Sequence, residues 1–416
     1  MFKNSILFRN KQLLAIGISI MIFNLSYSVL IPIIPVFFGM AGMSTLGIGY
    51  IMSAYAGSKC MAQIPSGIVA DLVGDKKILL IGLWLMGILM FGYTMTSSTV
   101  IIGVIYVLEG VVVGVATPAI YAVLGRSIEE GERGKSIGAF TSLSAFGFAL
   151  GPLLSGVIVD GTKSYDLVFY LASFGTFLTS WFVVCFIKES HGQANKNNEE
   201  PKERGSILNL IMLANRSGIL LKVIMLGSIS FLGDFIYGSM VSVLPLYGKS
   251  ILNSSITYIS FLISVNFFIF SFSAPLVGWL SDKIGAKKQI LVSLIIILIV
   301  FGVLSEVKEV VWFTAIIVIE FFLGSAMYSA LQSLLSKYGE NSNLRGVMYG
   351  AVGTFQSIGL ALGPVVSVFI YEFNKGYYFI GLTLITGLVL IIFLVLLRVI
   401  DRNDRCYEDK GIVNIT

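Results

Sequence analysis

Charge is scarce in this chain. Only 12% of its 416 residues are Asp, Glu, Lys or Arg, whereas 56% are hydrophobic. A soluble domain carries roughly a quarter charged residues. A soluble protein with this composition could not cover its surface with polar groups, so the surplus apolar surface needs lipid around it. The composition excludes an ordinary soluble globular protein and predicts an integral membrane protein.

Cysteine and histidine are also scarce. Cys60 and Cys185 lie in apolar runs, Cys406 lies in the polar tail, and the single histidine, His191, lies in a charged stretch. Their spacing is not typical of a disulfide framework or a zinc site. They form no Ser-His-Asp or Cys-His arrangement either. We therefore expect no metal, no cofactor and no enzymatic activity.

Long apolar runs fill most of the sequence. Roughly 20 apolar residues at 1.5 Å each cross a bilayer core of about 30 Å. The first run is too long for the core of a signal peptide and lacks a cleavage site of small residues, so it is interpreted as an uncleaved helix. We predict an all-α membrane protein with twelve transmembrane helices in two six-helix repeats. The predicted spans lie near 13–38, 47–70, 78–97, 100–124, 136–159, 166–187, 219–247, 255–280, 288–305, 310–335, 346–371 and 376–398.

A polar stretch separates the first six spans from the last six. It contains the run QANKNNEEPKER, a composition typical of a flexible linker. The predicted organisation is an N-terminal half over 1–187, a cytoplasmic linker over 188–218, a C-terminal half over 219–398 and a cytoplasmic tail over 399–416.

Lysine and arginine are distributed unevenly between the two sides of the membrane. With the N-terminus inside, the inner loops and tails hold 23 basic residues, the outer loops hold four, and Lys59 lies within a span. Cytoplasmic loops are enriched in Lys and Arg. Both termini are therefore predicted to be cytoplasmic. The protein itself is predicted to lie in the plasma membrane of the cell. The net charge of +5 reflects this topology and does not indicate a nucleic-acid partner.

The second half of the chain repeats the first. Three sequence elements recur in the same order, with shifts of 210 to 212 residues. They are 67–77 with 278–288, 24–37 with 234–247, and 138–156 with 350–368. Parallel halves with a substrate site between them are one design used by transporters.

The repeated pattern G-x-x-x-D-x-x-G-x-K-K resembles the signature of the major facilitator superfamily, and the resemblance covers nearly the whole chain. It implies the family fold, secondary active transport and a gating role for this pattern on the cytoplasmic side. The pattern comprises Gly67, Asp71, Gly74, Lys76 and Lys77, and Gly278, Asp282, Gly285, Lys287 and Lys288. The fifth span resembles the helix motif of the antiporter branch, through Gly138, Gly147, Gly151 and Pro152. The pair Pro32-x-x-Pro35 in the first span also resembles drug:proton antiporters.

Four charged residues lie deep within the predicted spans: Lys59, Glu109, Asp234 and Glu320. A charge near the middle of a bilayer costs at least about 2.5–3.5 kcal/mol, so these residues predict either a polar central cavity or buried ion pairs that hold helices together. Family members often carry an arginine in the fourth span, where this chain has Tyr106. An arginine-based account of proton coupling therefore does not apply.

Asp234 is the first choice for a proton carrier because its repeat equivalent is the neutral Asn24. A carboxyl group removed from water can hold a proton near neutral pH. Glu109 and Glu320 are the alternative carriers, and Lys59 is expected to face a carboxylate or an anionic group of the substrate. The predicted wall of the cavity includes Asn24, Tyr27, Tyr106 and Tyr237.

The predicted function is proton-coupled efflux of a hydrophobic or amphipathic small molecule by alternating access. The partners expected are this small molecule, protons and the lipid bilayer, with the protein acting as a monomer. A proton-coupled importer of a small metabolite is the alternative within transport. A membrane sensor on a transporter fold is the alternative from another class, although the tails and the linker are short for an output domain.

Overall fold

The computed structural model describes residues 11–126, 133–187, 219–340 and 345–409. Within these ranges the regular elements are helices, which confirms the predicted all-α class. The N-terminal half contains α2 (Lys11–Ser28), α3 (Ile34–Met40), α4 (Thr45–Val73), α5 (Asp75–Gly92), the 3-10 helix η2 (Tyr93–Met95), α6 (Thr99–Arg126), α7 (Arg133–Thr162) and α8 (Asp166–Phe186). The C-terminal half contains α10 (Ile219–Ser250), α11 (Ile256–Ile284), α12 (Ala286–Leu304), α13 (Val310–Glu340), α14 (Arg345–Phe373) and α15 (Tyr377–Asp409).

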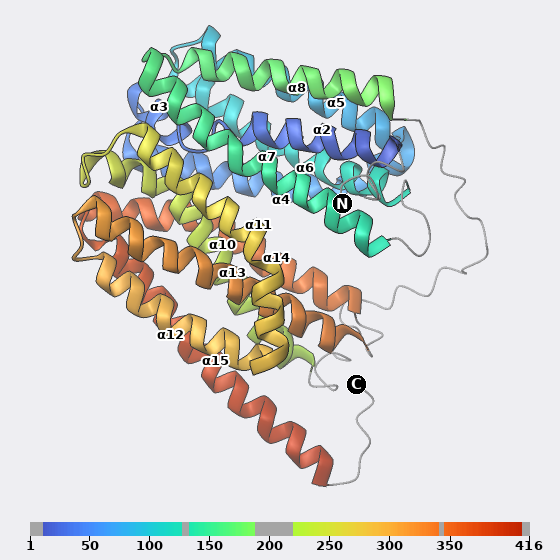
Figure 1. Cartoon of the computed structure of the whole chain (residues 1–416), viewed down its shortest axis with the longest axis vertical. Coiled ribbons are helices and arrows are strands. Elements are labelled where there is room, and N and C mark those ends of the chain that lie inside the picture. The colour runs from blue at the N-terminus through green and yellow to red at the C-terminus, as the bar shows by residue number, and fades with distance from the viewer. Residues whose placement is uncertain (1–10, 127–132, 188–218, 341–344, 410–416) are drawn as a thin grey trace.

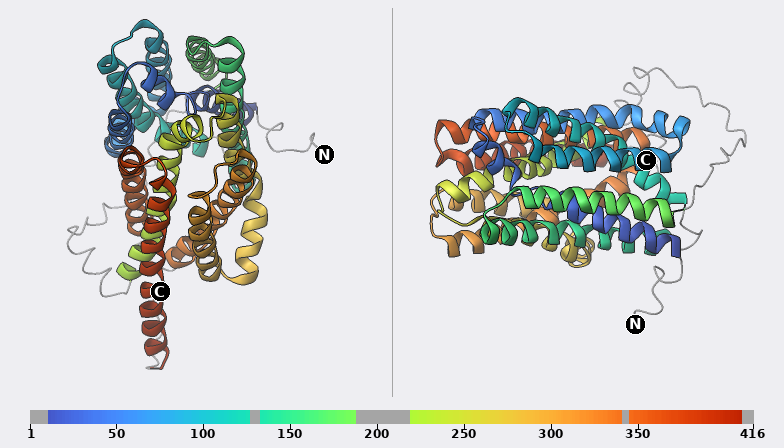
Figure 2. Two further views of the ribbon diagram at one scale, coloured as in Figure 1. Left: turned by 90° about the vertical axis from the view of Figure 1, so that its left-hand side faces the viewer. Right: turned by 90° about the horizontal axis from the view of Figure 1, so that it is seen from above.

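Two helical bundles lie side by side, α2 to α8 in one and α10 to α15 in the other (Figure 1). In the right-hand view of Figure 2 the helices of both bundles run in roughly the same direction, whereas Figure 1 shows α12 and α15 inclined to α5 and α8. We call the end that carries the short connections 163–165 and 251–255 the distal end. The opposite end, where α4 meets α5 and α11 meets α12, is called the proximal end. The bundles meet at the distal end and spread apart toward the proximal end (Figure 1).

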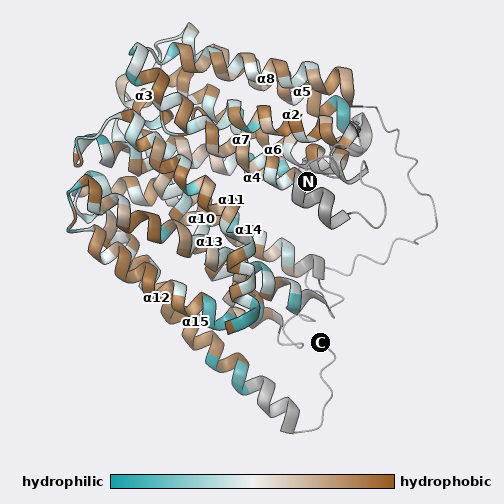
Figure 3. Ribbon diagram, viewed as in Figure 1, coloured by the Kyte–Doolittle hydropathy of each residue, from teal (hydrophilic) through white to brown (hydrophobic). Residues whose placement is uncertain are grey.

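The outer surface of the molecule suits lipid. Ten of the described helices are long and apolar enough to cross a membrane, and the apolar segment Leu13–Ser28 adds a shorter one. Large apolar side chains are exposed, among them Trp84, Trp181, Trp279 and Trp312. Hydrophobic residues cover the helices along most of their length (Figure 3). In water this exposed apolar area would be far larger than that of a soluble monomer, so the chain is a multi-pass membrane protein.

The first span is not one continuous helix. It divides into α2 and α3, and the residues between them form i→i−3 hydrogen bonds such as Ile33 N to Leu30 O, 3.1 Å. Pro32 and Pro35 lack the N–H groups that would continue the helical ladder. In the repeated element, α10 keeps only the second proline, as Pro245, and stays helical through it. The extra proline therefore accounts for the break.

Several helices extend beyond the predicted spans. α4 continues to Val73, α11 to Ile284 and α15 to Asp409. Most of the repeated signature pattern lies beyond the predicted spans 47–70 and 255–280, but in the structure it is mostly helical. Only Gly74 and Gly285 separate two helices, with φ of 96° and 89°. A side chain at such a positive φ is strained, whereas glycine is not, which explains the glycine at this place in both halves.

The glycines of the antiporter-type motif allow close helix packing in both bundles. Gly147 and Gly151 of α7 face the backbone of α2, and Gly359 and Gly363 of α14 face the backbone of α10. A Cβ atom at Gly151 would lie 2.6 Å from the carbonyl oxygen of Leu25. Small residues permit such approaches between membrane helices, so packing explains both glycine pairs. Pro152, next to Gly151, is buried inside α7.

Candidate functional site

A cavity of about 140 Å³ lies between the two bundles. Its wall comes from α2, α3, α4, α6 and α7 on one side and from α10 and α14 on the other. Most of the wall is apolar. The polar side chains that line it are Tyr27, Tyr55, Lys59, Tyr106, Glu109 and Tyr237. An apolar pocket with a few convergent polar groups is typical of small-molecule sites.

Tyrosine rings form one continuous side of the cavity. The hydroxyl groups of Tyr27 and Tyr55 are hydrogen-bonded at 2.6 Å. The ring of Tyr55 stacks on that of Tyr106, with centroids 4.7 Å apart and planes inclined by 24°. Phe148 of α7 meets Tyr27 edge to face at 6.1 Å. This wall presents flat apolar faces with hydroxyl groups between them, which suits an amphipathic aromatic molecule.

Glu109 is the carboxylic acid in the cavity wall. Its side chain is only 1% exposed, and the buried hydroxyl group of Tyr93 interacts with its carboxyl group, although the Oε1 atom has no hydrogen bond of good geometry within the described residues. The neighbouring Gly110 lets α6 approach α4 closely, because a Cβ there would lie 2.5 Å from the carbonyl oxygen of Tyr55. A buried polar atom without a partner is costly. A bound proton, or a donor group on a bound molecule, would relieve that cost.

Lys59 and Asp234 lie on opposite bundles, and their charges interact across the gap between the bundles. Lys59 of α4 lines the cavity and is half-buried. Asp234 of α10 is also half-buried but lies outside the lining, where its carboxylate interacts with the side chain of Gln356 of α14. Sequence reasoning did not identify Gln356. The repeat offered a signal. Gln356 is equivalent to Ser144, and Ser144 accepts hydrogen bonds from Asn24, the residue equivalent to Asp234.

Asn24, which the sequence predicted at the cavity, lies outside the cavity lining. Its Nδ2 atom donates a hydrogen bond of 2.6 Å to Ser144 Oγ and another of 3.2 Å to the Ser144 carbonyl oxygen. Asn24 is buried, so it joins α2 to α7. Glu320 also lies outside the lining. It is 4% exposed within the C-terminal bundle, at the position equivalent to Glu109.

The signature pattern lies at the proximal end, away from the cavity. Lys76 Nζ donates to the carbonyl oxygen of Val184 at 3.4 Å, which ties the start of α5 to the end of α8. Lys287 Nζ forms an ion pair with Asp401 Oδ1 at 2.6 Å, which ties α12 to α15. The side chains of Lys77, Asp282 and Lys288 are exposed, and Gly278 is half-buried. The surroundings of Gly67, Asp71 and Gly138 lie outside the described side chains.

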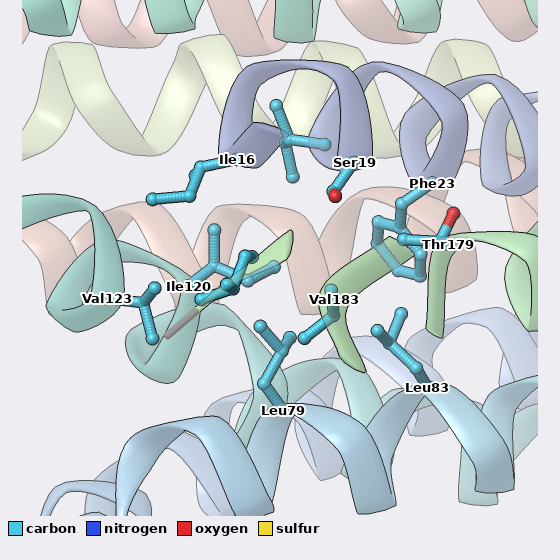
Figure 4. Close-up of a pocket in the computed structure, with 11 residues that line it drawn as sticks. Ile16, Ser19, Phe23, Leu79, Leu83, Ile120, Val123, Thr179 and Val183 are labelled. Carbon is cyan, nitrogen blue, oxygen red and sulfur yellow. The ribbon is translucent and has the colours of Figure 1, made fainter. Parts of the chain in front are cut away.

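A second, much smaller pocket of about 20 Å³ lies inside the N-terminal bundle (Figure 4). Its lining is apolar apart from Ser19 and Thr179. Both hydroxyl groups donate to the backbone of their own helix, Ser19 to Ala15 O and Thr179 to Gly175 O, each at 2.8 Å. The pocket therefore offers a ligand little beyond apolar contact, and we interpret it as a packing gap.

The architecture defines a class of protein: a helical membrane transporter with a small-molecule cavity between two bundles. The model of the Major Facilitator Superfamily matches the chain over residues 16–304 and 228–408. The chain belongs to this superfamily, as the repeated signature pattern predicted.

Several curated relatives are similar along most of their length. Multidrug resistance protein 2 of Bacillus subtilis is 24% identical, over 88% of this chain and 90% of the relative. Multidrug resistance protein MdtG of Salmonella arizonae is 27% identical, over 82% and 84%. Quinolone resistance protein NorA of Staphylococcus aureus is 22% identical, over 92% and 96%.

Solved structures share the fold. The nucleoside transporter NupG superposes with a TM-score of 0.71 at 14% identity, covering 93% of this chain and 98% of the other. The peptide transporter POT superposes with a TM-score of 0.75 at 18% identity, covering 94% and 95%. At these identities the likeness shows the fold alone.

Proposed function

We propose that this chain is a secondary active transporter that exports a hydrophobic or amphipathic compound in exchange for protons. The observation that carries the proposal is the cavity between the bundles, where a tyrosine wall meets the ionisable side chains of Lys59 and Glu109. An apolar wall suits the body of such a compound, and the charged groups suit a polar end or a proton. The relatives named for multidrug and quinolone resistance support export.

The proposed mechanism is alternating access, with the halves 1–187 and 219–398 moving about the cavity and the segment 188–218 linking them. Within the described residues, the hydrogen bonds that join the two bundles lie toward the distal end. They connect Thr257 to Asp160 and to Gly156, and Val365 to Ser53. This arrangement corresponds to a state closed at the distal end. Opening that end and closing the other would carry a bound compound across.

Asp234 is the proposed proton carrier. Its charged form attracts Lys59 on the opposite bundle, and a proton on Asp234 would remove that attraction. Protonation would therefore change the free energy that holds the bundles together, which is what coupling requires. Glu109 remains the alternative carrier inside the cavity. If Asp234 carries the proton, the proposed role of Glu109 is to receive a polar or cationic group of the compound.

The proximal end is proposed to face the cytoplasm, with both termini inside and the protein acting as a monomer. The support is the excess of Lys and Arg on that side, 23 against four. Cys406 in the C-terminal segment provides the test, in a variant that lacks Cys60 and Cys185. A membrane-impermeant thiol reagent should label Cys406 in inverted vesicles but not in intact cells. Labelling in intact cells would overturn the orientation.

The transport function is tested in proteoliposomes with an imposed pH gradient, across a panel of hydrophobic cations, zwitterions and neutral compounds. We expect at least one class to move against its own gradient when protons flow the opposite way, and to stop when an ionophore removes the pH gradient. Movement in the same direction as protons would instead support the importer. No movement of any compound would contradict the proposal.

A further inference from the structure

A contact between α7 and α11 joins the two bundles at the distal end. The backbone N–H of Thr257 donates to Asp160 Oδ2 at 2.8 Å, and the hydroxyl of Thr257 donates to the carbonyl oxygen of Gly156 at 2.9 Å. Asp160 and Gly156 belong to the N-terminal bundle and Thr257 to the C-terminal bundle. The contact therefore has to break when the bundles separate at this end.

The carboxylate of Asp160 completes the N-terminus of a helix in the opposite bundle. The first N–H groups of a helix have no acceptor within it. In α11, the cap residue Ser255 accepts the N–H of Tyr258 at 3.1 Å, which leaves the N–H of Thr257 for another acceptor. Asp160 supplies that acceptor and places its negative charge at the positive end of the helix dipole. A hydrogen bond to a charged group is stronger than one between neutral groups.

Gly156 allows this approach. A Cβ atom there would lie 2.7 Å from the Cα of Thr257 and 2.7 Å from the Cβ of Ser260. Side chains do not tolerate such distances, so any larger residue would push α7 and α11 apart. The carboxylate of Asp160 lies one helical turn further along the same face of α7, which brings it to the N-terminus of α11.

The related contact between α4 and α14 lacks the charge. The repeat makes Gly49 equivalent to Ser260 and Val368 equivalent to Gly156, and these two residues also meet, because a Cβ at Gly49 would lie 2.9 Å from Val368 Cβ. Here Ser53 Oγ accepts the N–H of Val365 at 3.1 Å. The residue equivalent to Asp160 is Glu372, whose side chain is exposed. The close packing is thus present in both contacts, whereas the charged cap is found in the contact between α7 and α11.

We propose that Asp160 is a positioning residue of the transport cycle, which holds the distal end closed by capping α11 from the opposite bundle and releases it when that end opens. The inference rests on the proposed alternating access, but it concerns the balance between two conformations and does not depend on the compound carried. Removing the carboxylate shifts the balance toward the state open at the distal end. Because hydrogen bonds to charged groups are the stronger ones, the expected shift in the ratio of the two states is about tenfold.

Distance measurements by pulsed electron paramagnetic resonance test this inference in lipid nanodiscs. Spin labels are placed at Ser98→Cys and Lys308→Cys, on distal connections of opposite bundles, after replacement of the three native cysteines by alanine. Asp160→Ala should raise the population with the longer distance about tenfold. Asp160→Asn keeps an acceptor without the charge and should give an intermediate ratio, and Asp160→Glu should restore part of the closed population.

Glu372→Gln is the matched control, since it removes the equivalent charge on the other side, and its distances should equal those of the parent. Gly156→Ala provides an independent route to the same open shift. Unchanged distances in both Asp160→Ala and Gly156→Ala would overturn the inference. The outcome is separable from the proposed function, because the distances are measured without substrate or pH gradient. A protein that transports nothing in the compound panel could still show the shift.

Discussion

The two bundles share one backbone plan but differ in the chemistry that they place at equivalent positions. Glu109 and Glu320 are equivalent and both buried, yet only Glu109 lines the cavity. Around Glu109 the N-terminal bundle places Tyr55, Tyr106 and Lys59, whereas the residue equivalent to Tyr106 is the core residue Ile317. The repeat therefore keeps the packing, and the N-terminal bundle supplies most of the polar groups of the site.

The contact that joins the first helix of each bundle to its fifth shows the same division. In the N-terminal bundle it is a neutral hydrogen bond between Asn24 and Ser144. In the C-terminal bundle the same positions hold Asp234 and Gln356, and Asp234 interacts with the charge of Lys59. A structural contact in one bundle has thus become an ionisable one in the other. This difference suggests where a proton would act.

The largest effect is expected when the ionisable Asp234 is made neutral like its equivalent, Asn24. Asp234→Asn should abolish uphill efflux driven by a pH gradient, because the amide keeps the size and hydrogen bonding of the side chain but cannot release a proton. Downhill exchange of the compound should survive. Asn24→Asp is the control in the other bundle and should affect coupling less. Full uphill efflux by Asp234→Asn with an unchanged pH profile would exclude Asp234 and reassign the proton to Glu109 or Glu320.

The next effect tests the difference between the two buried glutamates. Glu109→Gln should weaken binding of cationic compounds by roughly tenfold or more, in keeping with the loss of a charge-assisted hydrogen bond. Glu320→Gln should leave their affinity unchanged, because Glu320 lies outside the cavity lining. Fluorescence or calorimetric titration of the purified variants measures this. Equal losses of affinity in the two variants would contradict the assignment of the cavity.

A third prediction concerns the signature pattern at the proximal end. Asp71→Ala should lower turnover more than compound binding, because residue 71 lies near the end of α4, away from the cavity. Asp282→Ala, in the equivalent place on α11, shows whether both halves contribute. Transport rates and binding constants are measured on the same preparations. A collapse of affinity with unchanged turnover would refute a gating role for Asp71.

The smallest predicted effect tests the shared packing. Gly151→Ala and Gly363→Ala should each lower stability by about 1–3 kcal/mol, because the added methyl group overlaps the backbone of the neighbouring helix. Gly353→Ala on α14 is the control, since no atom lies within 4 Å of its Cβ position. That variant should be neutral or slightly stabilising. Thermal unfolding in detergent measures all three, and equal melting temperatures would contradict the packing role.

The sequence was sufficient to predict the helices, the repeat and the family, because apolar runs and repeated glycines are local signals. It also identified Glu109, Lys59, Tyr27, Tyr106 and Tyr237, which line the cavity. The rest depends on which face a helix turns inward. That face cannot be read from spans that are apolar on every side, so Asn24, Asp234 and Glu320 were grouped with the cavity residues although they lie outside its lining.

The contacts between the bundles were also beyond the sequence. Asp160 lies near the end of a predicted span and resembles an ordinary boundary residue. Its role depends on the distance to Thr257, which lies 97 positions further along the chain. Gln356 was likewise not predicted, because its role depends on Asp234, the residue with which it interacts. Pairing residues at equivalent places in the two repeats is the sequence signal that would have found it.

The central proposal is that the compound and the proton move across the membrane in opposite directions. The most direct measurement follows the pH inside proteoliposomes, without an imposed pH gradient, while a transported compound moves inward down its own gradient. We predict that the interior becomes more alkaline as protons leave, and that Asp234→Asn eliminates this change while the compound still exchanges. Acidification of the interior, or compound movement with no proton movement in the unmodified protein, would contradict it.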